Sequence, residues 1–163
     1  MRDVSKLMIG DFVYRIVTYV DLNGKQVTTK QLIQVCSVEE HSVQFKTNIA
    51  DSSPSMIYIT VMEDEIEPIE LTEEILEKNC FEKWSWYKRT GQPWWDAEKN
   101  IVITYAIGNG FQLEKRENSF MLVDCPSDLG DYGYEANWIT EVKYVHQLQH
   151  IVKTLDIDKE ITL

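Results

Sequence analysis

The stretch Tyr144-Val-His-Gln-Leu-Gln-His-Ile-Val-Lys-Thr-Leu155 predicts an amphipathic helix near the C-terminal end of the chain. At about 100° per residue, its apolar side chains fall within one stripe about 120° wide, which is enough to cover a sheet. The stripe consists of Tyr144, Val145, Leu148, Ile151, Val152 and Leu155. His146 and His150 point away from this stripe, so we expect both of them on a solvated face.

The first part of the chain reads as a series of short β-strands. Runs of β-branched and alternating residues, separated by turn residues, predict strands at 12–20, 25–38, 43–47, 56–62 and 65–69. Asn23-Gly24 predicts a two-residue hairpin turn in which both residues take positive φ. Because closing a short meander removes its exposed edges, residues 1–70 are predicted to form a small SH3- or Tudor-like β-barrel.

The remainder of the chain, residues 71–163, predicts a linking helix followed by an antiparallel meander. Thr72 is the expected N-cap of a helix that ends at Asn79. Strands are then predicted at 81–89, 101–107, 111–116, 119–123 and 138–142, with a hairpin turn at Gly108-Asn109-Gly110. A sheet covered by the C-terminal helix gives an α+β fold for the whole chain. The two β-rich parts are predicted either as two domains or as one integrated domain.

Composition narrows the classes of partner. The chain has 163 residues and a formal net charge of −11, which disfavours nucleic acids and anionic membranes because phosphate contacts need a positive face. The net charge does not exclude a local basic patch. The chain lacks a long apolar run, so we expect a soluble cytoplasmic protein without a membrane partner. Cys36, Cys80 and Cys125 form no CxxC motif and predict reduced thiols, the first two in the core.

The most unusual local composition lies at residues 84–95, where four tryptophans are interleaved with basic residues. Such a mixture suits stacking on bases or sugars, or the centre of a protein interface. Trp84 and Trp86 alternate as core residues of a strand would. Trp94 and Trp95 are adjacent and cannot both point inward, so one is expected at the surface. The predicted binding residues are Trp94, Trp95, Lys88 and Arg89.

Two further sequence patterns are candidates for functional sites. His146 and His150 have the i, i+4 spacing that lets two imidazoles share a zinc ion, which would suit a small metal-dependent hydrolase. The glutamate of the HExxH signature and a third ligand are missing, so a solvated pair is favoured, and no catalytic residue, metal or cofactor is predicted. The acidic stretch 63–77 could imitate the phosphates of DNA, although ordinary solubility is the simpler interpretation.

Three segments resemble a family of small uncharacterised bacterial proteins found in gut anaerobes and in their phages and mobile elements. These segments are Ile9-Gly-Asp-Phe-Val13, Ile66-Glu-Pro-Ile-Glu-Leu-Thr-Glu-Glu-Ile-Leu-Glu-Lys-Asn-Cys-Phe81 and Tyr144-Val-His-Gln-Leu-Gln-His150. The resemblance implies a β-rich N-terminal part and a docking helix, and it implies no activity or catalytic residue. We therefore expect a non-enzymatic protein of phage or mobile-element origin that binds another protein. An acidic DNA mimic and a metal-dependent hydrolase are the alternatives.

Overall fold

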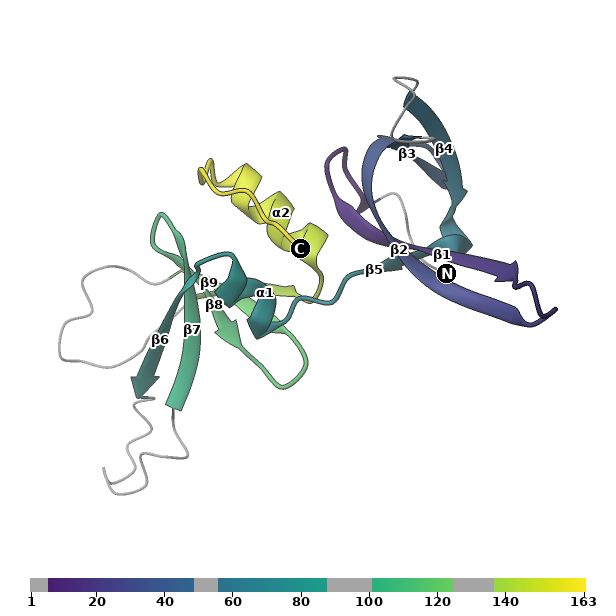
Figure 1. Ribbon diagram of the computed structural model, residues 1–163. Coiled ribbons are helices and arrows are strands. Elements are labelled where there is room, and N and C mark those ends of the chain that lie inside the picture. The colour runs from purple at the N-terminus through teal and green to yellow at the C-terminus, as the bar shows by residue number, and fades with distance from the viewer. Residues whose placement is uncertain (1–5, 49–55, 88–100, 125–136) are drawn as a thin grey trace. The chain divides into compact units, whose positions relative to one another are not determined.

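The computed structural model describes residues 6–48, 56–87, 101–124 and 137–163. The chain divides into two compact units, one extending to Ile69 with Tyr144–His146, the other comprising Glu70–Lys143 and Gln147–Leu163. Each unit contains one five-stranded antiparallel sheet (Figure 1). The fold is mostly β with a C-terminal helix, as the α+β prediction requires.

The first unit is built on a sheet with the strand order β4-β3-β2-β1-β5. The strands are β1 (Phe12–Val20), β2 (Gln26–Val38), β3 (Ser42–Asn48), β4 (Met56–Met62) and β5 (Ile66–Pro68). A short 3-10 helix, η2 (Glu63–Glu65), leads from β4 into β5. Within the described residues, the strand pairs form an open series and close no barrel.

One apolar core serves all five strands of this sheet. Side chains alternate between the two faces of a strand, so every second residue can be buried. The core residues are Leu7, Val13, Ile33, Val35, Val43, Phe45, Val61 and Ile66. The register between β2 and β3 shifts between Val35 and Ser37, an irregularity of the kind that bends a strand.

The hairpin between β1 and β2 differs from its prediction. Five residues, 21–25, separate the two strands, and only Gly24 among them has a positive φ, of 78°. The side chain of Asp21 replaces the expected turn chemistry, because its Oδ1 accepts hydrogen bonds from the backbone N–H groups of Asn23 and Lys25, both at 2.9 Å. An aspartate that bonds to the backbone ahead of it stabilises a wider turn.

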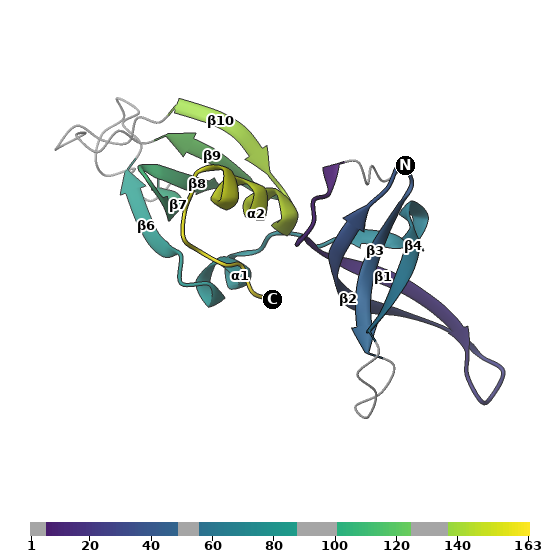
Figure 2. The ribbon, with the colours of Figure 1, turned by 90° about the horizontal axis from the view of Figure 1, so that it is seen from above.

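The second unit is built on a sheet with the order β10-β9-β8-β7-β6. Its strands are β6 (Glu82–Tyr87), β7 (Ile101–Gly108), β8 (Phe111–Lys115), β9 (Phe120–Asp124) and β10 (Asn137–Val142). The predicted turn between β7 and β8 is confirmed, since Asn109 and Gly110 have φ values of 52° and 82°. The helices α1 (Glu73–Lys78) and α2 (Val145–Thr154) lie over one face of this sheet (Figure 2).

Both helices confirm most of their predicted features. Thr72 caps α1 by accepting a hydrogen bond from the backbone of Ile75 at 3.4 Å, and Asn79 ends the helix. In α2, Leu148 and Val152 are buried as the apolar stripe requires. The prediction for His146 is wrong, because this residue is only 7% exposed. Tyr144 precedes the helix, and its ring stacks on the His146 ring with centroids 5.7 Å apart.

Cys36 and Cys80 were predicted to lie in the core, and the structure contradicts this prediction. Cys80 is exposed and Cys36 is half-buried, whereas Cys125 lies outside the described residues. Cys80 directly follows the last capped turn of α1 and has a φ of 56°, the left-handed conformation that commonly ends a helix. The apolar residues around Cys80 in the sequence therefore did not predict its burial.

Asn79 joins the end of α1 to the last residues of the chain. Its Nδ2 donates to the carbonyl oxygens of Ile75 and Thr162, each at 2.8 Å, and its Oδ1 accepts from the backbone N–H of Thr162 at 2.7 Å. The side chain is 8% exposed, so water cannot easily replace these bonds. One amide thus fixes residues that are 83 positions apart in the sequence.

We predict that Asn79→Ala lowers the free energy of unfolding by about 1–3 kcal/mol, because it leaves buried backbone groups without partners. Urea unfolding measures the loss, and hydrogen exchange of the Thr162 amide locates it. Thr162→Ala is the matched control, since it removes only the weaker hydroxyl contact at 3.2 Å. Equal stability of the two variants would contradict this role for Asn79.

Candidate functional site

The face of the second sheet that lies away from α1 carries a set of aromatic and charged side chains, which we name the tryptophan face. It comprises Trp84, Trp86, Thr104, Glu114, Arg116 and Trp138. Strand register places Trp84 opposite Thr104, and Thr104 opposite Glu114. Directly paired residues point to the same side of an antiparallel sheet, so these side chains share one surface.

Two indoles at the β6 edge of the tryptophan face support each other. The rings of Trp84 and Trp86 stack with centroids 5.4 Å apart and an interplanar angle of 13°. The indole Nε1–H of Trp86 donates to Thr104 Oγ1 at 2.9 Å. Since Thr104 is fully buried in the neighbouring strand, this bond fixes the pair of rings to the sheet.

Glu114 organises the other half of the tryptophan face. Only 2% of this residue is exposed, and its carboxylate forms an ion pair with the Arg116 guanidinium at 2.9 Å. Its second oxygen accepts a hydrogen bond from the indole Nε1–H of Trp138 at 3.3 Å. The Arg116 guanidinium also lies over the Trp138 ring, 4.9 Å from its centroid. Glu114, Arg116 and Trp138 therefore hold one another in place.

The fixed indoles are nevertheless open to solvent. Trp84 is 39% exposed and Trp138 is 63% exposed. Single exposed apolar residues are common, but rings that are both exposed and bonded in place resemble the anchors of binding surfaces. The prediction that Trp84 is a core residue is wrong, because β6 is an edge strand and this ring faces away from the helices.

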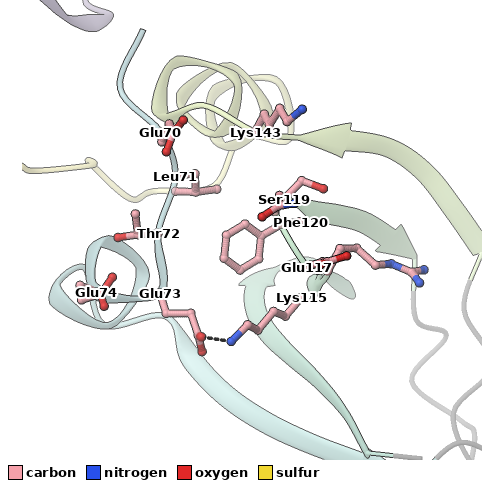
Figure 3. A pocket seen from close by; sticks show the side chains of 12 residues that line it. Glu70, Leu71, Thr72, Glu73, Glu74, Lys115, Glu117, Ser119, Phe120 and Lys143 are labelled. Atoms are coloured by element: carbon pink, nitrogen blue, oxygen red, sulfur yellow. Dashed lines mark hydrogen bonds and ion pairs between the residues drawn. The ribbon is translucent and has the colours of Figure 1, made fainter.

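A second feature, a pocket of about 460 Å³, lies beside α1 (Figure 3). It is lined by Glu70, Leu71, Thr72, Glu73, Glu74, Lys115, Arg116, Glu117, Asn118, Ser119, Phe120 and Lys143. Figure 3 shows the Glu73 carboxylate pointing at the Lys115 amine. Glu73 also accepts hydrogen bonds from the Tyr105 hydroxyl and, at 3.1 Å, from the Lys83 amine.

The ionic cluster at this pocket keeps its groups in their ordinary charge states at neutral pH. The hydrogen bond from Lys115, followed by that from Tyr105, lowers the pKa of Glu73 to about 2. Burial and the bond to Glu73 raise the pKa of Tyr105 to about 12, and the bond to Glu73 raises the pKa of Lys83. A general acid or base needs a pKa near the working pH, so this cluster is suited to holding α1 on the sheet.

The four predicted binding residues, Trp94, Trp95, Lys88 and Arg89, lie outside the described residues. The structure therefore does not test them. Of the histidine pair, His150 is half-buried and His146 is buried against Tyr144. Among the residues that the structure describes, no group of three or more His, Cys, Asp or Glu side chains is placed to hold a metal ion.

The acidic stretch 63–77 is not a row of free charges. Glu67 pairs with Lys30, and both Glu73 and Glu77 contact Lys83, with Glu77 at 3.1 Å. In η2, Glu65 accepts a hydrogen bond from the backbone N–H of Met62 at 3.2 Å. Several carboxylates of this stretch thus stabilise local structure, which leaves fewer of them to imitate phosphates.

Sequence reasoning missed the parts of the tryptophan face that come from β8 and β10. The only available signal was the alternation of Glu114 and Arg116, which places both on one side of a strand. The predicted meander order of β8, β9 and β10 is confirmed, but the partnership with Trp138 also depends on the register of these strands, which shifts between Trp138 and Thr140 and follows from no local motif.

No protein-family model, curated protein or solved structure matches this chain. In the described part of the chain, the helices are too short or too polar to cross a lipid bilayer.

We predict that the cluster around Glu73 makes unfolding depend on pH in the acid range. Because the pKa of Glu73 is lowered from 4.5 to about 2 in the folded protein, its stabilising effect is present above pH 4.5 and disappears as the pH falls toward 2. Glu73→Gln should remove this part of the pH dependence and lower stability at pH 7.

Thermal unfolding of the intact chain and of Glu73→Gln between pH 7 and pH 2 tests this prediction. Glu77→Gln is the control, because Glu77 contacts the same lysine but is 54% exposed. The stability difference between the intact chain and Glu73→Gln should shrink as the pH falls. A difference that stays constant down to pH 2 would refute the assignment.

Proposed function

We propose that this protein acts without catalysis, by binding another protein through the tryptophan face. The observation that carries the proposal is the combination of exposure and fixation at Trp138, which is 63% exposed while Glu114 and Arg116 hold its ring. Tryptophan and arginine are enriched among the residues that dominate protein interfaces.

A fixed aromatic surface favours binding for a physical reason. Ordering a side chain on association costs free energy, and rings that are already held in the free protein avoid much of this cost. Trp84 and Trp86 form one such unit at the β6 edge, and Trp138 forms another at the β10 edge. A partner that covers both would bury large apolar areas at a low entropic cost.

The predicted binding residues extend this proposal along the chain. Lys88 and Arg89 directly follow β6, and Trp94 and Trp95 come a few residues later. We propose that these four residues contribute to the same binding region. Their support is their position in the sequence, immediately after the strand that carries Trp84 and Trp86.

The context of the protein is proposed from its sequence. The resemblance to small bacterial proteins of phages and mobile elements supports an accessory role in the cytoplasm of a host cell. For the first unit we propose an SH3- or Tudor-like shape. Its support is the single core shared by five strands and the irregularity in β2 that allows the sheet to curl.

We predict that the Trp84→Ala/Trp138→Ala double variant loses partner proteins that the intact chain captures from a host lysate. The reason is that the substitution removes the two most exposed rings of the tryptophan face. Quantitative mass spectrometry of the captured proteins measures the loss. A Trp94→Ala/Trp95→Ala variant tests the proposed extension in the same experiment.

Tyr19→Ala/Tyr58→Ala is the matched control, because these rings are 49% and 56% exposed but belong to the first unit. The control should capture the same proteins as the intact chain. Thermal unfolding of every variant checks that it is folded. If the folded double tryptophan variant kept all of its partners, the tryptophan face would not be the binding site.

A further inference from the structure

The tryptophan face carries an excess of negative charge. Besides Glu114 on β8, the side of the sheet on which the tryptophan face lies carries two further carboxylates, Glu82 on β6 and Glu141 on β10. Among the described residues that share this face, Arg116, which directly follows β8, provides the positive charge, and it is paired with Glu114. Glu82 and Glu141 are both exposed, and neither forms an ion pair with a cation of the described ranges. One oxygen of Glu141 accepts a hydrogen bond from the Ser119 hydroxyl at 2.7 Å, which leaves its second oxygen for another donor.

Strand geometry places each of these exposed carboxylates beside an exposed indole. Glu82 and Trp84 are two residues apart on β6, so their side chains leave the same face about 7 Å from each other. On β10, register sets Trp138 opposite Val123 and Glu141 opposite Met121, so they too are neighbours on that face. Each edge of the sheet therefore presents an exposed indole, Trp84 or Trp138, beside an exposed carboxylate.

A lysine or arginine side chain fits such a pair. The face of an indole attracts a cation through its quadrupole, and a neighbouring carboxylate adds a charged hydrogen-bond acceptor. Arg116 already demonstrates this arrangement within the molecule, since its guanidinium contacts both the Trp138 ring and the Glu114 carboxylate. A cation from a partner would contact Glu141 at the β10 edge, and another would contact the pair of Glu82 and Trp84 at the β6 edge.

We infer that the partner presents a basic protein segment with two cationic side chains, one for each edge of the tryptophan face. The inference rests on the proposed function and names the chemistry of the partner. The two edges are four strand spacings apart, about 19 Å, which an extended segment spans with about six residues. The net charge of −11 on the whole chain favours the approach of such a segment.

The probe is a synthetic ten-residue peptide with two arginines six positions apart in a Gly/Ser background. It is added to the full chain labelled with ¹⁵N, and the indole N–H signals are followed by NMR. Trp84→Phe and Trp138→Phe variants assign the two relevant signals. Three comparison probes replace it in turn: the same peptide with citrulline for arginine, a neutral glucose hexasaccharide and a single-stranded oligodeoxynucleotide.

We expect the arginine peptide to shift both indole signals and the citrulline peptide to leave them unchanged. Glu82→Gln/Glu141→Gln should weaken binding of the arginine peptide about tenfold, because the two substitutions together remove both charged acceptors beside the exposed indoles. Glu40→Gln/Glu160→Gln, which removes two exposed charges elsewhere, should weaken it much less. Raising the salt concentration should weaken the binding as well.

Four outcomes would overturn the inference: equal shifts with the citrulline peptide, equal weakening by the two pairs of glutamine substitutions, shifts with only the hexasaccharide or the oligonucleotide, or no shift with any probe. The failure of the proposed function is distinguishable from these. Equal shifts with both peptides would leave a protein-binding face without a preference for charge. Shifts with only the hexasaccharide or the oligonucleotide, or none with any probe, would argue against both.

Discussion

The buried carboxylate of Glu114 is the constraint on which the tryptophan face depends. A carboxylate that is only 2% exposed must find charged or donating partners inside the protein, because an unpaired buried charge is very costly. Arg116 and Trp138 supply them, at 2.9 Å and 3.3 Å. The requirement to pair one charge therefore determines where an exposed indole and a guanidinium are held. Side chains that would otherwise sample many rotamers are thereby ordered in the free protein.

The opposite face of the same sheet is held by apolar burial and by an ionic cluster with α1. There Tyr105 and Leu113 are buried, and Glu73 on α1 is bound by Lys115 on β8 and Lys83 on β6. With a pKa of about 2, Glu73 stays charged under ordinary conditions and holds the short helix in position. The two faces of the sheet thus differ in role. The face with Tyr105 and Leu113 is packed under helices, and the tryptophan face presents the rings of Trp84 and Trp138 to solvent. This division explains how a small sheet can carry the exposed rings of Trp84 and Trp138 without losing its core.

The sequence predicted those helix ends and turns that depend on capping and turn residues close to them in the chain. Thr72 and Asn79 marked the ends of α1, and Asn109-Gly110 marked a tight hairpin that the structure confirms. The two-residue turn predicted at Asn23-Gly24 is wrong, because the Asp21 side chain accepts hydrogen bonds from the backbone N–H groups of a wider turn. His146 was assigned to a solvated face because helical periodicity placed it away from Tyr144, whereas Tyr144 precedes the helix and its ring stacks on His146. The meeting of Trp138 and Glu114 was beyond prediction, because it depends on the register of β8, β9 and β10, including the shift between Trp138 and Thr140.

The order of the indole of Trp138 in the free protein tests the central claim most directly, and ¹⁵N relaxation of its side-chain N–H measures it. If Glu114 and Arg116 hold the ring, its order parameter should lie near the value of about 0.85 that is typical of rigid backbone. It should also fall in Glu114→Gln, where the charged acceptor is lost. An order parameter below about 0.6 in the intact chain would contradict the account, because it would mean that the ring is mobile and that the surface is not organised in advance.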